Sequence, residues 1–297
     1  MATHEPPRDP VIDAWIQHPT PAMLRDPMFD SLRRWIGADA LPPGGFPLAL
    51  TRGLLDAGRV DHALITAWYG PRGPLVSNDE VAAYVAAMPG RLSGVASVDL
   101  SRPVAAVREL RRAVGELGFK ALRMLPWLWD RPPDDRLYYP LYAACVDLGV
   151  PFCLQVGHTG PLAPSEWGRP IPYLDRVALD FPELVIVGGH IGYPWTEEMI
   201  ALARKHENVW IDTSAYKPSR YPAALVEYLR TSRAHKVLFG SNAPMLAPAA
   251  CLAEVPALGL SDAARRRFLS ENARAVFGLA EPAGAPATRV VDSGTGG

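Results

Sequence analysis

Short apolar runs alternate with longer amphipathic segments along most of this 297-residue chain. Several short runs, such as LVIVGG at 184–189, are almost continuously apolar, as is typical of strands buried on both faces of a parallel sheet. The pattern predicts eight strands, over residues 11–17, 63–68, 92–100, 119–125, 152–156, 184–189, 209–214 and 236–240.

The amphipathic segments between these strands carry helix start and stop signals. Ser77 and Glu80 form the S-x-x-E pattern of a capping box, and Pro103 stands where the first turn of another helix begins. Gly118 and Gly149 stand where C-cap glycines end helices. The pattern predicts a helix from residue 77 and others over 28–36, 103–117, 139–148, 172–180, 196–206, 221–231 and 262–277.

Eight strands that alternate with helices favour an α/β fold, a single (β/α)8 TIM barrel over residues 1–280. A doubly wound sheet is the alternative, but no G-x-G-x-x-G follows the first strand. Residues 19–58 make a long first connection with a Pro/Gly turn at 42–45, which would form a short cap over the mouth of the barrel. The small, polar, Gly-rich tail at 281–297 is expected to be disordered.

Composition excludes several classes of protein. The chain is 48% hydrophobic and 21% charged, which is typical of a soluble globular domain. A formal net charge of −1 argues against binding to nucleic acid or anionic membranes through bulk charge. The longest uncharged run, at 237–253, contains polar residues and prolines and does not predict a membrane span. Three cysteines make no disulfide framework, and the polar start is no signal peptide, so we expect a cytoplasmic protein.

Candidate site residues follow from the fold, because a (β/α)8 barrel carries its chemistry where strands end and the following loops begin. Most of the predicted strands contribute polar or aromatic side chains at that end. The candidates are Trp15, Gln17, His18, Trp68, Arg123, Trp127, Gln155, His158, His190, Asp212, Tyr216 and Asn242.

Seven stretches of the chain carry a resemblance to a known family. They are IDAW, GFKALRMLPW, GVPFCLQVGHTG, LDFPELVIVGGHIGYPW, RKHENVWIDTSAY, KVLFGSNAP and ENARAVFGL. In this order and spacing, the chain resembles the amidohydrolase-related family that includes aminocarboxymuconate-semialdehyde decarboxylase and resorcylate decarboxylases. The resemblance extends from about residue 11 to residue 279 and implies a TIM barrel that acts on a small molecule.

The resemblance also implies metal ligands at five positions, of which the chain keeps one. The H-x-H of the first strand falls on Trp15 and Gln17, and the His of the fifth strand falls on Gln155. The His of the sixth strand is His190, and the Asp of the eighth falls on Asn242. Indole offers no lone pair and neutral amides are weak zinc ligands, so we expect no family-type zinc site and no cofactor. A rebuilt three-imidazole site from His18, His158 and His190 is the alternative.

Each polar candidate has a functional and a structural interpretation. We expect His190 to act as a general acid or base, with Asp212 assisting. Arg123 would hold a substrate carboxylate, and Gln155 and Asn242 would stabilise an oxyanion. The structural alternatives are a hydrogen-bonded imidazole for His190 and an internal salt bridge for Arg123. For Asp212 the alternative is a cap or a hydrogen bond to Ser214 or Thr213. The amides would then only fill the space of lost ligands.

The remaining candidates suit a pocket for a planar substrate. Trp15, Trp68 and Trp127 would wall an aromatic ring, although tryptophans also pack in any core. The other four pocket candidates, alternatively loop residues or fillers, are Gln17, His18, His158 and Tyr216.

These assignments favour a metal-independent hydrolase acting on a small carboxylate-bearing lactone, ester or amide, and replacing His190 with Ala would then abolish turnover. Some members of the wider superfamily are lactonases that work without metal. One alternative is non-oxidative decarboxylation of a small aromatic or unsaturated acid, and another is a barrel that binds a small molecule without catalysis. The expected partner is a small-molecule substrate, without nucleic acid or membrane, and a homo-oligomer is left open.

Overall fold

The computed structural model of the chain describes residues 8–35 and 45–280. Eight strands pair in parallel in the order β1-β2-β5-β6-β7-β8-β9-β10. Their bounds are β1 (Ile12–Ile16), β2 (His62–Thr66), β5 (Leu92–Ala96), β6 (Ala121–Met124), β7 (Phe152–Gln155), β8 (Ile186–Gly189), β9 (Val209–Asp212) and β10 (Val237–Leu238). Each lies within, or one residue outside, a predicted strand.

The first and last strands of this sheet meet and make it a barrel. Residues Ile16 and Ala243 form a parallel bridge. The backbone N–H of Asn242 donates to the Trp15 carbonyl at 2.9 Å, and the backbone N–H of Gln17 donates to the Ala243 carbonyl at 3.0 Å. The (β/α)8 fold predicted from the alternation of strands and helices is therefore confirmed.

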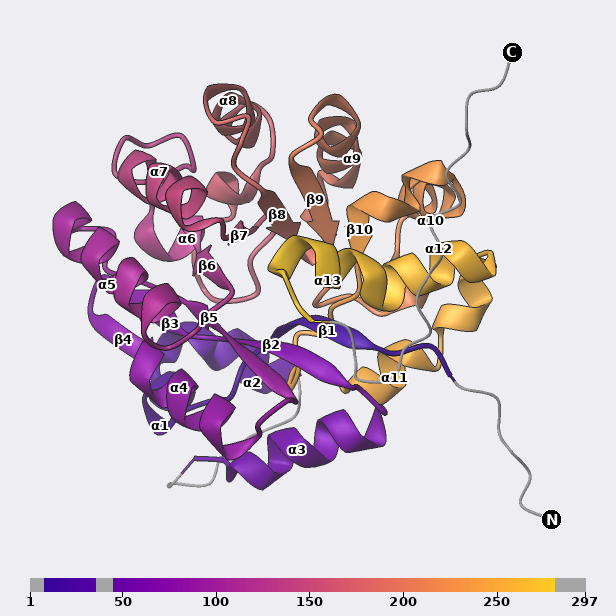
Figure 1. The fold of residues 1–297 in the computed structure, drawn as a ribbon, viewed down its shortest axis with the longest axis horizontal. Helices are drawn as coiled ribbons and strands as arrows, with labels where there is room; N and C mark the ends of the chain where they lie inside the picture. The colour runs from indigo at the N-terminus through magenta and orange to yellow at the C-terminus, as the bar shows by residue number, and fades with distance from the viewer. Residues whose placement is uncertain (1–7, 36–44, 281–297) are drawn as a thin grey trace.

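Helices surround the barrel, as Figure 1 shows. The main outer ones are α4 (Asn78–Ala87), α5 (Pro103–Gly115), α7 (Tyr139–Leu148), α8 (Tyr173–Asp180), α9 (Thr196–Lys205) and α10 (Ala223–Arg230). The Ser77–Glu80 capping box is confirmed, and Gly149 ends α7 at a φ of 64°. The helix predicted over 103–117 is capped earlier, at Glu116.

Two local predictions need correction. Trp68 does not end the second barrel strand but opens a small antiparallel hairpin of β3 (Trp68–Gly70) and β4 (Gly73–Val76). Glycine at position 73, with a φ of 107°, permits its tight turn. The helix predicted over 262–277 consists of α12 (Asp262–Arg266), a π-helical turn (Arg267–Glu271) and α13 (Asn272–Phe277).

The first connection reaches across the carboxyl ends of the strands. It contains α1 (Pro21–Arg25), a 3-10 turn (Pro27–Phe29), α2 (Asp30–Trp35) and α3 (Leu48–Ala57). The Ser31 hydroxyl donates to the Gly160 carbonyl at 2.5 Å, and the Leu162 amide donates to the Met28 carbonyl at 2.8 Å. These bonds fasten the connection to the loop after β7. Residues 42–44 of the predicted turn, residue 36 of the predicted helix and the tail at 281–297 lie outside the described residues.

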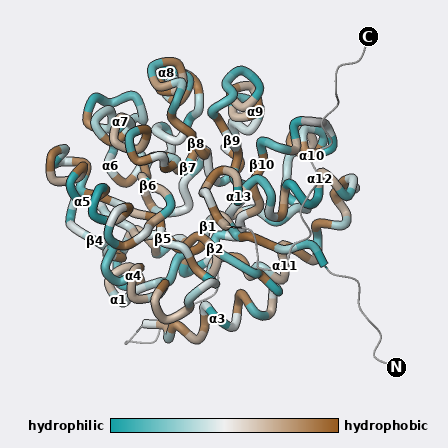
Figure 2. The backbone as a smooth tube through the Cα atoms, viewed as in Figure 1, coloured by the Kyte–Doolittle hydropathy of each residue, from teal (hydrophilic) through white to brown (hydrophobic). Residues whose placement is uncertain are grey.

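Side chains in the barrel interior form layers. Apolar residues near the strand starts, including Ile12, Ala121 and Cys153, form one buried cluster with Phe277 of α13. In Figure 1, α13 crosses the centre of the barrel, and Figure 2 shows hydrophobic stretches along the strands. A layer of buried charges follows, and the cavity described below lies beyond it. No helix among residues 8–35 and 45–280 is long and apolar enough to cross a membrane.

Two short helices complete the fold near the strand ends. They are α6 (Pro126–Trp129) after β6 and α11 (Pro248–Leu252) after β10. Contacts between α11 and α3 tie the loop after the last strand to the first connection. The mouth of the barrel is thus framed by segments from both ends of the chain.

Candidate active site

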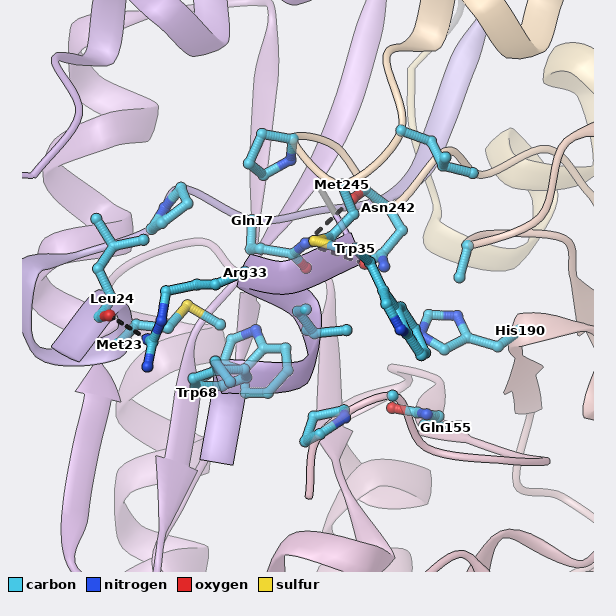
Figure 3. A pocket seen from close by; sticks show the side chains of 18 of the residues that line it. Gln17, Met23, Leu24, Arg33, Trp35, Trp68, Gln155, His190, Asn242 and Met245 are labelled. Carbon is cyan, nitrogen blue, oxygen red and sulfur yellow. Dashed lines mark hydrogen bonds between the residues drawn. The ribbon is translucent and has the colours of Figure 1, made fainter. Parts of the chain in front are cut away.

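A cavity of about 520 Å³ lies at the carboxyl ends of the strands, where (β/α)8 enzymes carry their active sites. Polar lining is sparse among the described residues: Gln17, Arg33, Gln155, His158, His190 and Asn242. The larger apolar and aromatic side chains that line it are Met23, Leu24, Phe29, Leu32, Trp35, Phe46, Trp68, Tyr193, Tyr216, Met245 and Leu246. Figure 3 shows most of these side chains converging on one space.

A hydrogen-bonded chain leads from a buried carboxylate to His190 on the cavity wall. Oδ2 of Asp212, at the end of β9, lies 2.9 Å from the Ser214 hydroxyl, which lies 2.7 Å from Nδ1 of His190. An ionised carboxylate can only accept, so Ser214 donates to Asp212 and accepts from the Nδ1–H of His190. In this tautomer, Nε2 of His190 carries a lone pair and is free of a proton.

Burial sets the charge states of His190 and Asp212, the two end residues of this hydrogen-bonded chain. Desolvation, together with the nearby Arg123 charge, lowers the pKa of His190 to about 3. Desolvation raises the pKa of Asp212 to about 6, against the opposing effect of Arg123. Near neutral pH, His190 is therefore a neutral imidazole and Asp212 is mostly an anion.

Arg123 lies beneath the cavity and does not line it, which corrects its expected role as a clamp for a substrate carboxylate. Its guanidinium stacks 3.2 Å from the ring centroid of Trp15 and donates to the Ala14 carbonyl at 3.2 Å. Its position on β6 points it into the barrel, whose interior also holds Asp13 and Asp212. Their charges stabilise its cationic form, although burial lowers the pKa of Arg123 to about 10.

Trp15 separates this buried charge from the cavity. Its ring centroid lies 4.7 Å from that of His190, but Trp15 itself does not line the cavity among the described residues. Its expected role in the substrate wall is therefore corrected to support of His190. A Cβ at Gly189 would lie 2.6 Å from the Trp15 ring, so glycine makes room for the indole.

The three amides are held by hydrogen bonds in two groups. Nε2 of Gln17 donates to the carbonyl and side-chain oxygens of Asn242, at 3.2 and 3.0 Å. Oε1 of Gln155 accepts from the Trp127 indole at 2.9 Å, and its Nε2 donates to the His158 carbonyl at 3.2 Å. The donors fix which way each amide points. Asn242 thus keeps its Nδ2 for a ligand, whereas Trp127 acts behind Gln155 and does not line the cavity.

Neither His18 nor His158 forms a metal site with His190. The His18 ring is bound by Thr51 at 2.8 Å and the Phe46 carbonyl at 3.0 Å, which corrects its expected place in the pocket. His158 is exposed at the rim and stacks on Trp35, with 6.4 Å between ring centroids. Among the described residues, no three His, Cys, Asp or Glu side chains are close enough to hold a metal ion.

A family-type metal site does not fit the residues present. One implied ligand position holds an indole, and two hold amides that bond each other. The amide oxygen of Gln155 is occupied by Trp127. Neutral amides and indole are poor ligands for zinc, and only His190 offers a strong donor.

The structure brings together seven of the twelve predicted residues on one cavity. They are Gln17, Trp68, Gln155, His158, His190, Tyr216 and Asn242. Asp212 does not line the cavity but is linked to His190 through the Ser214 hydroxyl. Sequence reasoning missed Asp13 and Arg33, and it gave Ser214 only as a hydrogen-bond partner in the structural alternative for Asp212. Asp13 had a signal, because it is a charge inside an apolar strand.

The comparisons with known proteins agree with this architecture. Residues 18–279 match the sequence family described as amidohydrolase. The chain belongs to the amidohydrolase family. This confirms the resemblance found in the sequence.

Two curated relatives of this amidohydrolase are both gamma-resorcylate decarboxylases. The protein from Polaromonas is 29% identical over 170 residues, which cover 48% of this chain and 51% of the relative. The protein from Rhodococcus jostii is 31% identical over 189 residues, which cover 51% and 54%. The chain therefore spans about half the length of the curated relatives it matches.

Solved structures share the fold over nearly the whole chain. A TIM-barrel protein from Bordetella bronchiseptica has a TM-score of 0.77 at 24% identity, covering 90% of this chain and 98% of its own. A probable 2-pyrone-4,6-dicarboxylic acid hydrolase from Acinetobacter baumannii has a TM-score of 0.62 at 15% identity, covering 91% and 99%. At these identities the likeness shows the barrel alone.

Proposed function

We propose that this amidohydrolase is a non-oxidative decarboxylase of a small hydroxylated aromatic acid, and that it works without a bound metal. The observation that carries the proposal is the hydrogen-bonded chain Asp212–Ser214–His190, which ends at an apolar cavity. The names of both curated relatives support this reaction class. They support it better than the hydrolysis favoured from the sequence.

The side chains present suit a reaction driven by proton transfer. Nε2 of His190 takes the proton of a ring hydroxyl beside the carboxylate and then gives it to the carboxyl-bearing carbon. The C–C bond breaks, its electron pair restores the aromatic ring, and CO2 leaves. The phenolate then takes a proton from solvent, so that H⁺ replaces CO2 overall. Asp212, acting through Ser214, stabilises the transient imidazolium.

The cavity wall assists by favouring CO2 over a carboxylate. Nδ2 of Asn242 and the second Nε2 hydrogen of Gln155 can orient the carboxylate. The rest of the wall is mostly apolar. Such surroundings solvate an anion poorly and neutral CO2 well. They therefore destabilise the bound carboxylate relative to the CO2 that it releases.

The first experiment measures CO2 release from a panel of hydroxybenzoic acids. We expect release by the wild-type protein and a loss of about 100-fold or more in His190→Asn. Asn suits this test because His190 has a φ of 67°, a conformation that Asn tolerates. The control is His62→Asn, since His62 bonds Gly90 and Ser93 away from the cavity. Full CO2 release by His190→Asn would overturn the proposal.

The pH dependence should report Asp212. Below its pKa of about 6, Asp212 is protonated and donates a hydrogen bond to the Ser214 hydroxyl. Ser214 then donates to Nδ1 of His190, so the proton of His190 moves to Nε2. The base is then lost, so the rate should rise with pH through about 6 and level off above it. In Asp212→Asn this limb should vanish, and a limb kept unchanged in that variant would contradict the assignment.

Hydrolysis of a lactone or ester is the second candidate. A neutral imidazole base near two amide N–H donors is an arrangement that also suits attack of water on a carbonyl. Incubation with lactones separates the two, because hydrolysis yields a hydroxy acid and no CO2. Turnover of either kind would exclude a barrel that only binds its ligand.

A further inference from the structure

The cavity has two chemically different ends, and we propose that the substrate carries an apolar arm opposite its carboxylate. The inference rests on the proposed function, since it takes the reacting acid group as the polar head. Figure 3 shows His190 and Gln155 at one side of the cavity, Met23 and Leu24 at the other, and Gln17 between them. A ligand that spans this space must match both sides.

The polar end holds the groups that can act on a carboxylate. Gln155 ends β7, and His190 and Asn242 come after β8 and β10. Each has polar hydrogen-bonding capacity beyond the hydrogen bonds described above. The carboxylate and its neighbouring hydroxyl therefore belong at this end. A substituent on the opposite ring carbon, para to the carboxylate, then points toward Met23 and Leu24.

The apolar end is built by the first connection. Met23 and Leu24 of α1 line it together with Phe29, whose ring contacts Trp68 with 5.8 Å between centroids. Met23 and Phe29 are buried. These side chains offer dispersion contacts and no hydrogen bonds, which suits a saturated carbon chain.

Among the described residues that line the cavity, the one Arg or Lys is Arg33, and its charge is already neutralised. Arg33 lines the cavity, but it is ion-paired with Asp30. It also donates to the Leu24 carbonyl at 2.5 Å, an interaction drawn in Figure 3. With those partners satisfied, Arg33 does not create a second site for an anion, and the end keeps its apolar character.

The size of the cavity supports an arm. Its volume of about 520 Å³ is in the range that encloses drug-sized ligands, whereas a dihydroxybenzoate has only about eleven non-hydrogen atoms. The wall is also fixed, since Ser31 and Met28 bond the loop after β7. A single-ring acid without an arm would leave the apolar end unfilled.

The test is a series of salicylates that carry no substituent, or a methyl, propyl or pentyl group para to the carboxylate. Dissociation constants are measured by calorimetry on His190→Asn protein, so that turnover does not disturb them. We expect affinity to rise about threefold for each added methylene. Constant or falling affinity along the series would overturn the inference.

A matched pair of variants locates the arm. In Leu24→Gln, the pentyl compound should lose about tenfold in affinity while salicylate loses less than about twofold. Leu179→Gln is the control, because Leu179 is an exposed leucine of α8 outside the cavity lining. Equal losses for both compounds in Leu24→Gln would overturn the placement.

The two proposals fail separately. CO2 release from salicylate with no gain from the arm would leave the decarboxylase and remove the arm. A gain in affinity along the series, with no CO2 from any member, would leave the arm and remove the decarboxylase.

Discussion

Among single residues, Asp13 shows what the barrel interior does to a charge. It is fully buried, and its Oδ1 accepts from the Ser241 and Trp15 amides at 2.9 and 3.2 Å. Its Oδ2 has no hydrogen-bond partner among the described residues. Burial raises the pKa of Asp13 to about 7, and the nearby Asp212 adds to the rise. Ionised Asp13 is therefore costly to the fold.

This cost predicts a pH-dependent effect of Asp13→Asn on stability. The folded protein keeps the proton up to about pH 7, whereas the unfolded chain loses it near 3.8. The stability from Asp13 is thus present at low pH and lost as pH rises from about 4 to 7. Asn cannot titrate, so the free energy of unfolding of the variant relative to wild type should gain on the order of 4 kcal/mol across that window.

Urea unfolding at a series of pH values checks this prediction. Asp147→Asn serves as control, because Asp147 is exposed on α7. A difference between Asp13→Asn and wild type that stays constant with pH would refute the buried-charge interpretation.

Among the secondary-structure elements, β1 and β8 are complementary in side-chain size, because a tryptophan on β1 packs against a glycine on β8. Trp15 leans against Gly189, and His190 follows directly with a left-handed backbone. Strand prediction gave both segments correctly, because apolar runs report burial. The pairing of a bulky residue on one strand with glycine on another is a tertiary fact, since the two are far apart in the sequence.

We therefore expect Gly189→Ala to be destabilising by about 1–3 kcal/mol, through overpacking against Trp15. The matched control is a second Gly→Ala substitution that should raise the free energy of unfolding instead of lowering it. Gly53 lies inside α3 with open space around it, so Gly53→Ala should stabilise by about 0.5–1 kcal/mol. Thermal unfolding of both variants checks the pair, and equal effects would show that Trp15 can move aside freely.

For the whole molecule, convergence of strand ends decides whether a metal can bind. The positions implied by family resemblance do meet at one cavity or just beneath it. Their donors are an indole, three amides and one imidazole. That set is too weak for a divalent metal in the usual family manner.

Dialysis against a strong chelator should therefore leave both turnover and the midpoint of thermal unfolding unchanged. Added zinc or manganese should not raise the rate. Elemental analysis before and after dialysis completes the measurement. A metal near one per chain, with activity lost on its removal and restored on its return, would reverse this conclusion.

The sequence by itself determined the eight strands, the barrel and the strand ends that face the site, because hydrophobic periodicity is a local property. It also showed that four ligand positions of the family had changed. The hairpin at Trp68 escaped prediction, since a short pattern fits both a strand end and a turn. The disorder expected of the tail at 281–297 stays a prediction, because these residues lie outside the described part of the structure.

Only the tertiary structure decided how these residues meet. Gln17 bonds Asn242 across 225 positions of sequence, Arg123 stacks beneath Trp15 rather than facing the cavity, and Ser214 links Asp212 to His190. The apolar end of the cavity comes from a connection that folds back over the strand ends. Such partners are set by barrel closure and by packing of unequal side chains, which no local pattern encodes.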